Sequence, residues 1–313
     1  MKDIGVVIVT FNSSSHIRDC LDSLLIKNLK NINKVVIVDN NSDDNTVDII
    51  KKNFPQIEFI KNSSNLGYAK AVNIGMKKLN ENYCLIANPD TVFKSSSLNY
   101  LKNTIHSDNT IAIVGGQQTY GGNIWQRSYG NYPGIMDALL NLFFITSVSN
   151  LYKRLKLKYS INNKTKYVNY VDGGAMLVRN KAFKQVDGFK EDYFFYAEEA
   201  DFAYRLKKRK WKIVFEPKAL IHHIRGGSST KLNEKTAYFQ ELLVKSKMLF
   251  LELNTPRASI KLYIFIEYLH SLKMFLLYRI IFGISQDKKY YTKAELFKNF
   301  LKIWKQKLYH QFK

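Results

Sequence analysis

The sequence is poor in cysteine and in acidic residues. Two cysteines among 313 residues cannot build a disulfide framework, and no charged-then-apolar leader follows Met1, so we expect a protein that is not secreted. Asp and Glu number 26 against 48 Lys and Arg, which gives a formal net charge of +22. This excess predicts a negatively charged partner, such as nucleic acid, an anionic membrane surface or a phosphorylated substrate. A general Lys, Asn and Ile bias of the sequence would explain part of the same excess.

Two nucleotide-binding signatures are also missing. No GxGxxG follows the first predicted strand, and neither GxxxxGKS nor GxxxxGKT occurs, which argues against the ordinary dinucleotide-binding and P-loop classes. With 46% hydrophobic and 14% aromatic residues, the chain can bury a sizeable core, so disordered, collagen-like and coiled-coil classes are excluded. The sequence therefore predicts a globular protein that holds any nucleotide in another way.

The basic excess lies outside the first third of the chain. Residues 1–110 carry 13 Lys and Arg against 11 Asp and Glu, residues 111–230 carry 19 against 9, and residues 231–313 carry 16 against 6. The pattern of the chain also changes after Thr230, from alternating strands and helices to long helices. We therefore expect a boundary near this residue.

Short β-branched runs alternate with helical patterns over residues 1–115. This alternation predicts βαβ units around a parallel sheet that has helices on both faces. The predicted strands are 4–10, 34–39, 57–62, 83–88 and 111–115, and after an irregular aromatic region at 116–170 two more are predicted at 175–178 and 212–216. In such sheets ligands bind beyond the carboxyl ends of the strands, and here four of these ends carry polar residues. The sequence therefore predicts a nucleotide-type crevice at this rim.

Six sequence motifs occur in the order and spacing of a known family. They are VVIVTFN at 6–12, VDNNSDD at 38–44, NLGYAKAVNIG at 65–75, ANPD at 87–90, FFYAEEADFAYR at 194–205 and HIRGGS at 223–228. Together they resemble the inverting family 2 glycosyltransferases, in particular their rhamnosyltransferase-like branch, over roughly residues 4–230. One such motif alone is a weak signal, whereas six in order are specific.

The resemblance implies a GT-A fold, which is an α/β fold with a Rossmann-like mixed sheet, together with a nucleoside diphosphate sugar donor and a divalent cation, Mg²⁺ or Mn²⁺. Carried over residue by residue, Asp39 accepts a hydrogen bond from the pyrimidine ring, Asp90 approaches the metal and the diphosphate, and His223 ligates the metal. This sequence has Asn88 where many relatives have a first Asp, which removes one anionic ligand. The residues by themselves leave open that Asp39 and Asp90 are turn residues and that His223 is a core histidine.

Further donor contacts are expected along the same rim, at Thr10, Asn12, Asn41, Asn65, Gly67, Lys70 and Asn88. Asn65 and Gly67 would shape the donor loop. Lys70 would contact either a phosphate or only solvent.

An acidic segment supplies candidates for a general base. The acceptor hydroxyl must lose its proton during glycosyl transfer, and a positioned carboxylate can take it. Glu198, Glu199 and Asp201 lie within four residues. The second position of the family's Glu-Asp pattern is the usual base, so Glu199 is our candidate, although the longer Glu side chain leaves the choice between it and Glu198 open. The alternative is a solvated helix start, where acidic side chains favour the helix dipole.

Acceptor contacts are expected from Asp172, Asp201 and Trp125. Asp172 would either face the acceptor or start a turn before Gly173 and Gly174. Residues 116–175 shape the acceptor pocket, so the sugar and the linkage are not readable from the motifs.

The C-terminal segment is apolar but not uniformly so. Residues 260–283 are interrupted by Lys261, Glu267, His270, Lys273 and Arg279, which are too many charged and polar groups for a membrane-spanning helix. An amphipathic helix that lies in the plane of an anionic membrane surface fits better. The alternative is that the same apolar face packs on the catalytic domain or on a second subunit as a homodimer.

These observations predict a GT-A catalytic domain at 1–230 and a basic helical extension at 231–313. Within the domain, residues 1–115 form the donor half and residues 116–230 the acceptor half. The predicted function is an inverting transferase that moves a sugar, with rhamnose as the first choice, to a saccharide or lipid-linked glycan in surface polysaccharide biosynthesis. We expect it in the cytoplasm, peripheral to the inner face of the cell membrane. Two alternatives are a basic nucleic-acid-binding protein and a non-catalytic nucleotide-sugar-binding subunit.

Overall fold

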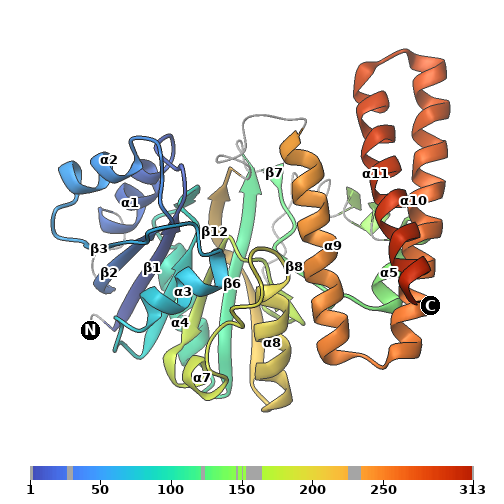
Figure 1. Ribbon diagram of the computed structural model, residues 1–313. Helices are drawn as coiled ribbons and strands as arrows, with labels where there is room; N and C mark the ends of the chain where they lie inside the picture. The colour runs from blue at the N-terminus through green and yellow to red at the C-terminus, as the bar shows by residue number, and fades with distance from the viewer. Residues whose placement is uncertain are drawn as a thin grey trace. The chain divides into compact units, whose positions relative to one another are not determined.

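The computed structural model describes residues 3–26, 31–120, 124–145, 147–149, 151–152, 164–224 and 234–311. The chain divides into two compact units (Figure 1). The first unit consists of Met1–Tyr132 and Tyr152–Thr230, and the second consists of Pro133–Leu151 and Lys231–Lys313. The end of the HIRGGS motif, residues 225–228, lies outside the described residues.

The first unit is built on a mixed sheet with the strand order β3-β2-β1-β4-β11-β6-β12-β5. β1, β2, β3 and β4 are parallel to one another, and β11 enters antiparallel between β4 and β6. β12 runs parallel to β6 and pairs antiparallel with β5. The strands are β1 (Ile4–Thr10), β2 (Ile32–Asp39), β3 (Glu58–Lys61), β4 (Tyr83–Ala87), β5 (Thr91–Phe93), β6 (Ile111–Tyr120), β11 (Ala175–Arg179) and β12 (Lys212–His223).

Shorter strands extend or flank this sheet. β7 (Ile124–Trp125) pairs with β6, and β9 (Lys166–Tyr167) pairs with β12. β8 (Tyr129–Gly130) and β10 (Tyr170–Val171) form a separate antiparallel pair. β6 and β12 are longer than the predicted strands 111–115 and 212–216, because Gly116 to Thr119 of β6 pair with Glu216 and with Leu220 to His222 of β12.

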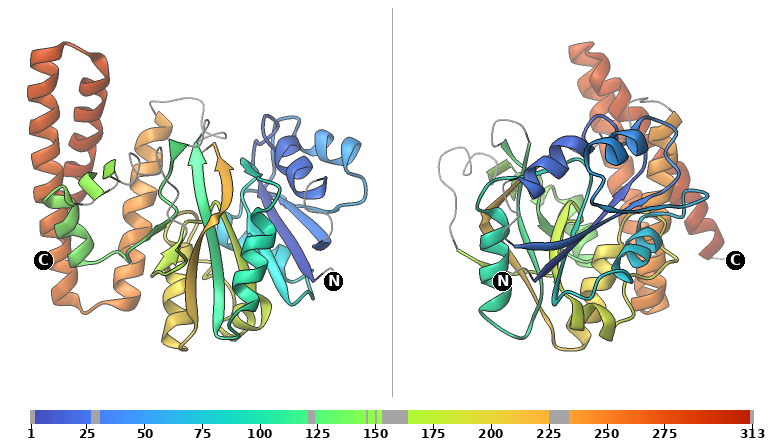
Figure 2. Two further views of the ribbon diagram at one scale, coloured as in Figure 1. Left: turned by 180° about the vertical axis from the view of Figure 1, so that it is seen from behind. Right: turned by 90° about the vertical axis from the view of Figure 1, so that its left-hand side faces the viewer.

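Helices cover both faces of the sheet, as Figure 2 shows from two sides. Alternate strand residues point to opposite faces. Val6 and Ile8 of β1 therefore belong to the core beneath α1, whereas Val7 meets Gly75 of α3. An added Cβ at Gly75 would lie 2.6 Å from Val7, so glycine lets α3 approach the sheet closely. The helices of this unit are α1 (Ile17–Leu25), α2 (Thr46–Asn53), α3 (Tyr68–Met76), α4 (Ser97–His106), α7 (Asn180–Gln185) and α8 (Glu198–Lys208).

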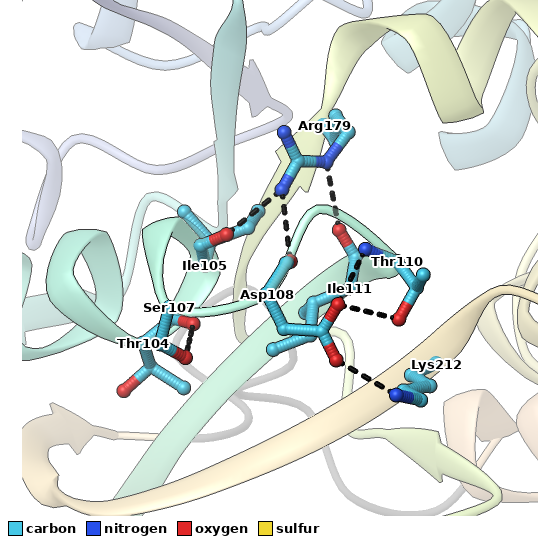
Figure 3. A network of polar contacts seen from close by, with 8 residues as sticks. All are labelled: Thr104, Ile105, Ser107, Asp108, Thr110, Ile111, Arg179 and Lys212. Atoms are coloured by element: carbon cyan, nitrogen blue, oxygen red, sulfur yellow. Dashed lines mark hydrogen bonds and ion pairs between the residues drawn. The ribbon is translucent and has the colours of Figure 1, made fainter.

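A hydrogen-bond network around Arg179 connects the amino ends of β6 and β12 to the C-terminal end of α4 (Figure 3). Its guanidinium group donates hydrogen bonds to the backbone carbonyls of Ile105, Asp108 and Ile111. The Asp108 carboxylate in turn accepts a hydrogen bond from Lys212 Nζ at 2.7 Å. This network holds one end of the strands whose other ends carry the candidate site.

The second unit is helical. It contains α5 (Ile135–Leu142), α9 (Glu234–Asn254), α10 (Arg257–Ser285) and α11 (Lys288–Gln311). Its core gathers Leu251 of α9, Tyr263 of α10, Trp304 of α11 and Ala138 of α5. Within the part of the chain that the structure describes, no helix is both long and apolar enough to cross a bilayer.

Candidate active site

The end of β4 leads into the Asn88, Pro89, Asp90 triplet and then into β5. The Asn88 N–H donates to the Gly174 carbonyl at 2.9 Å, which fixes the triplet against the chain before β11. Because β5 pairs with the end of β12, His223 lies opposite Thr91 in the register and therefore beside Asp90. His223 Nε2 lies 3.3 Å from Asp90 Oδ1. The structure thus brings together two predicted site residues that are far apart in the sequence.

The Asp90 carboxylate is stabilised in its charged form. Burial by itself raises the pKa of Asp90, but the hydrogen bond and charge of His223 outweigh it, so that the pKa lies below its ordinary value. Asp90 is therefore ionised at neutral pH although its side chain is mostly buried.

The acidic segment begins α8. Two residues before it, Tyr196 and Ala197, have φ values of +72° and +63°, a region that non-glycine residues rarely occupy. Such backbone strain is concentrated at functional sites, where the surrounding structure enforces it. Glu198 follows directly and is only 4% exposed. The turn thus carries the first carboxylates of the helix into the interior.

Glu198 and Glu199 are poorly satisfied carboxylates. The Oε2 atom of each is buried and has no hydrogen-bond partner among the described residues. Burial, followed by the charge of Asp172, raises the pKa of Glu199 to about 7. Burial, followed by the charge of Glu199, raises the pKa of Glu198 well above its ordinary value. Two adjacent carboxyl groups with raised pKa values are suited to accept or hold a proton near neutral pH.

Tyr68 links these carboxylates to Asp90. Burial raises the pKa of its phenol well above the ordinary value, and the charges of Glu198, Glu199 and Asp90 act in the same direction. Its hydroxyl lies 3.5 Å from the Gly173 carbonyl, and an added Cβ at Gly173 would lie 3.5 Å from Glu199 Oε1. Tyr68 was not among the predicted site residues, although its place directly after Gly67 at the start of a helix was a usable signal.

The predicted donor loop, at Asn65 and Gly67, contacts the chain just before the acidic segment. Gly67 has φ +83°, and an added Cβ there would lie 2.7 Å from the Phe194 carbonyl oxygen, so this position requires glycine. The Asn65 side chain accepts a hydrogen bond from the Gly67 N–H at 3.0 Å, and the Tyr68 N–H donates to Phe194 O at 2.7 Å. Lys70, about half exposed, lies 4.0 Å from Glu191.

The loops after β1 and β2 form a polar network around Asp39. Its carboxylate has no exposed surface and accepts hydrogen bonds from Thr10 Oγ1 and from the N–H and Oγ of Ser42, at 2.6 to 2.9 Å. The Asn12 N–H donates to Ser42 Oγ at 2.9 Å. Asn12 and Asn41 both have φ values in the left-handed region, which asparagine tolerates. Asp39 thus holds together the loops that carry the predicted donor contacts.

The three predicted acceptor residues, Asp201, Asp172 and Trp125, lie in different environments. Asp201 is 1% exposed and pairs with Arg205 at 2.6 Å, and Arg205 also donates to the carbonyls of Val186 and Gly188, so this pair anchors α8. Asp172 lies 3.9 Å from Arg127 and close enough to Glu199 to raise its pKa. Trp125 is buried in β7. Of the three, Asp172 is therefore the one whose charge acts on the predicted base Glu199.

Asp90 and His223 fit a divalent cation. No cluster of three His, Cys, Asp or Glu side chains suited to a metal occurs in the described ranges. A hard cation such as Mg²⁺ is commonly held by one or two protein ligands together with substrate phosphates and water. An ionised carboxylate and an imidazole nitrogen that face each other at 3.3 Å meet this requirement.

The chain is similar in sequence to known glycosyltransferases. The model of the family "Glycosyl transferase family 2" matches residues 5–187. The chain is 28% identical over 241 residues to an N-acetylglucosaminyl-diphospho-decaprenol L-rhamnosyltransferase of Mycobacterium tuberculosis, covering 71% of this chain and 77% of that one. It is 23% identical to the rhamnosyltransferase WbbL of Escherichia coli, with coverages of 68% and 80%.

Solved structures resemble the fold. One is a mannosyltransferase of Pyrobaculum calidifontis in complex with GDP-Man and Mn²⁺, with 13% identity, a TM-score of 0.61, and coverage of 96% of this chain and 85% of that one. Another is GalNAc-T7 with UDP, GalNAc and Mn²⁺, with 15% identity and a TM-score of 0.59. The match covers 80% of this chain but only 48% of the GalNAc-T7 chain.

Proposed function

The chain belongs to glycosyl transferase family 2, and on this premise we propose that it moves a sugar from a nucleoside diphosphate donor to a saccharide or lipid-linked glycan, with inversion at the sugar. Its membership of the family, its class as a glycosyltransferase and its GT-A fold confirm the expectations from the sequence. Rhamnose is our first choice of sugar, because two of its relatives are rhamnosyltransferases.

One observation carries the proposal. An added Cβ at Gly173 would lie 3.5 Å from Glu199 Oε1, and one at the next residue, Gly174, would lie 2.6 Å from Nδ1 of His223, whose ring pairs with the Asp90 carboxylate. A candidate base, Glu199, and a candidate cation site, Asp90 with His223, therefore both lie beside the Gly173–Gly174 segment. Displacement of a diphosphate by a hydroxyl group needs both at a short separation.

Glu199 is the proposed base. Its pKa of about 7 leaves a large ionised fraction at neutral pH and a strong tendency to take a proton as the acceptor hydroxyl attacks. The hydroxyl oxygen forms a bond to the anomeric carbon, the bond from that carbon to the diphosphate oxygen breaks, and the proton passes to Glu199. Attack opposite the leaving group inverts the anomeric configuration. Burial, followed by the charge of Glu199, also raises the pKa of Glu198 beside it.

Asp90 and His223 are the proposed ligands of Mg²⁺ or Mn²⁺. The cation would supply charge compensation for the leaving diphosphate. Asp90 is already ionised, and His223 holds its ring toward that carboxylate, so neither side chain has to move far to bind. On the donor side, we propose that Asp39 acts by holding the loops of Asn12 and Asn41 in place, because its own carboxylate is fully buried.

The second unit offers a surface for a membrane. α10 exposes an apolar stripe with side chains 36 to 83% exposed, and their spacing of three, four or seven residues keeps them on one side of the helix. α11 carries seven Lys and one Glu. We propose that this unit attaches the enzyme to an anionic bilayer, where apolar side chains and cations both contribute. The stripe consists of Leu262, Phe265, Leu269, Leu276, Ile280 and Ile284.

A panel of nucleotide sugars tests the function. The full chain is mixed with UDP-, GDP- and dTDP-sugars in the presence of Mn²⁺, and thermal stabilisation and sugar release are measured. We expect one donor to raise the melting temperature and to be turned over. Stabilisation without any turnover, with acceptor glycans present, would favour a non-catalytic nucleotide-sugar-binding subunit. Binding to nucleic acid with no response to any donor would contradict the proposal altogether.

A further inference from the structure

A buried glutamine lies behind the proposed cation ligand. Gln118 is in the part of β6 beyond the predicted strand, and it is 1% exposed. Its Oε1 atom lies 2.8 Å from His223 Nδ1, and its Nε2 atom donates to the Asp172 carbonyl oxygen at 3.2 Å. The side chain therefore bridges the proposed cation ligand and the backbone beside the catalytic carboxylates.

These contacts determine the tautomer of the imidazole. The Asp172 carbonyl can only accept, so the Gln118 amide must turn its NH₂ group toward Asp172 and its oxygen toward His223. An amide oxygen cannot donate, so His223 Nδ1 must carry the hydrogen. In the charged ring Nε2 also carries a hydrogen and donates it to Asp90 Oδ1, which lies 3.3 Å away; in the neutral ring Nε2 is unprotonated and its lone pair faces that oxygen. A nitrogen lone pair and a carboxylate repel each other unless a proton or a metal cation lies between them.

Gly174 makes room for this arrangement. A Cβ at that position would lie 2.6 Å from His223 Nδ1 and 2.9 Å from Gln118 Nε2. The backbone of Gln118 is held as well, since its N–H donates to Ser128 Oγ at 2.8 Å. Its neighbour Gln117 is equally buried, but its amide contacts Gln118 O, Gln126 O and Ser128 Oγ and not His223.

We propose that Gln118 is a positioning residue that holds His223 in the Nδ1–H form, so that Nε2 is presented with Asp90 to a divalent cation. This inference rests on the proposed metal-assisted function. Hydrogen bonds to the second nitrogen of a ligating histidine are a general means of orienting the ring, and their loss lowers metal affinity by about 10- to 100-fold.

Three variants of the full chain test the inference. Gln118→Met keeps the size of the side chain but removes the acceptor. Gln118→Glu restores an acceptor, and as a carboxylic acid it can also donate to Asp172. Gln117→Met is the matched control, because it makes the same change one residue earlier. Circular dichroism melts establish that each variant is folded.

Binding of Mn²⁺, alone and with dTDP, is measured by the loss of the free Mn²⁺ signal in electron paramagnetic resonance. We expect Gln118→Met to weaken binding by about 10- to 100-fold, Gln118→Glu to recover most of it, and Gln117→Met to match the wild type. Wild-type binding by Gln118→Met, or equal losses in Gln118→Met and Gln117→Met, would overturn the inference.

Nitrogen NMR of the histidine rings separates this inference from the proposed function. It is recorded without metal at pH 8.5, well above the ordinary range of imidazole titration, and the signal of His223 is assigned by its loss in His223→Gln. We expect the Nδ1–H tautomer in the wild type and a shift toward Nε2–H in Gln118→Met. The Nε2–H tautomer in the wild type would overturn the inference whatever the enzyme binds. The expected tautomer together with full turnover in excess chelator would refute the metal-assisted function and leave the tautomer assignment standing.

Discussion

The two units of this protein differ in where most of their charged residues lie, although each buries a carboxylate oxygen without a hydrogen-bond partner among the described residues, at Glu198 in the first unit and at Glu267 in the second. The first unit buries the Glu198 side chain and the Oε2 atom of Glu199 without giving either Oε2 atom a hydrogen-bond partner among the described residues. The second unit buries an aromatic and aliphatic core and leaves the lysines of α11 largely at the surface. Burial moves a pKa and prepares a group for chemistry, whereas exposure preserves a charge for long-range attraction. The comparison therefore supports the proposals that proton transfer takes place in the first unit and that the second unit attaches to a surface.

The largest expected effect is at the base. Glu199→Gln keeps the size of the side chain and removes the proton acceptor, so turnover should fall by roughly 10² to 10⁴ while donor binding persists. Steady-state kinetics with the best donor, and calorimetric titration of that donor, measure the two quantities. A fully active Glu199→Gln beside an inactive Glu198→Gln would shift the base by one residue. Vesicle binding, which belongs to the second unit, should be unchanged in both variants.

The wild-type pH profile provides a second view of the same residue. The base must be ionised, and burial raises the pKa of Glu199 to about 7. Turnover should therefore increase as the pH rises through about 7 and then level off. A profile that is already flat from pH 5 upward would mean that the base has an ordinary carboxylate pKa and is not Glu199.

The next largest effect is at the cation site. Asp90→Ala removes the ionised partner of His223, and we expect a loss of turnover of roughly 10²-fold or more in a protein that remains folded. Excess EDTA should inactivate the wild type, and added Mn²⁺ or Mg²⁺ should restore it. Full activity in excess chelator would contradict the proposed role of Asp90.

A smaller effect on membrane binding, roughly 30-fold, is expected in the second unit. Phe265→Ser with Ile280→Ser removes two exposed side chains from the stripe of α10. Each contributes on the order of 1 kcal/mol when it enters an apolar phase, given that about half of the side chain is accessible. Sedimentation with anionic and neutral vesicles, at low and high salt, measures the binding. The control is Tyr167→Ser, which removes an exposed aromatic group from the first unit. Equal loss in the two variants, or no binding by the wild type, would contradict the membrane proposal.

The sequence predicts the regular part of the first unit well. β1 and β4 are largely apolar runs that end at polar residues, and the predicted ranges 4–10 and 83–88 agree with the observed strands within one residue. β6 was predicted to stop at Gly115, because Gly116, Gln117 and Gln118 do not follow a strand pattern. They continue the strand because β12 pairs with them, which is a contact between distant parts of the chain. Local propensity contains no information about such a pairing.

In the candidate site, too, local sequence predicted some features, whereas others depend on contacts between distant parts of the chain. The acidic residues at 198–201 are visible in the sequence because they lie close together. The contact between Asp90 and His223 depends on the pairing of β5 with β12, and only the family resemblance anticipated it. Gln118 was missed, since a glutamine carries no signal of its own until its two partners are known. In the C-terminal segment, hydrophobicity predicted an apolar helix, but only packing shows that Tyr263 faces the core and Phe265 the surface.

The smallest expected effect is one of stability, and it follows directly from the comparison of the units. The pKa of Glu199 is about 7 in the folded chain and 4.5 as its ordinary value. Between these values the folded state keeps a proton that the unfolded state has lost, so the raised pKa lowers stability progressively as the pH rises from about 4.5 to about 7, and the full penalty remains above pH 7. Glu199→Gln has no such group. The variant should therefore be more stable than the wild type at pH 8, on the order of 1 to 3 kcal/mol or a few degrees in Tm, with a much smaller gain at pH 5.

Thermal unfolding of both proteins at pH 5 and pH 8 measures this difference. Lys298→Gln, a change at an exposed position of α11, is the control and should alter stability little at either pH. A gain of equal size at both pH values would mean that the amide stabilises the fold by packing and not by relief of a buried charge. A loss at pH 8 would mean that the ionised carboxylate is well accommodated in the folded protein. Either result would remove the physical reason for regarding Glu199 as a strained, reactive group, because a base prepared by burial must lower the stability of the unit that contains it.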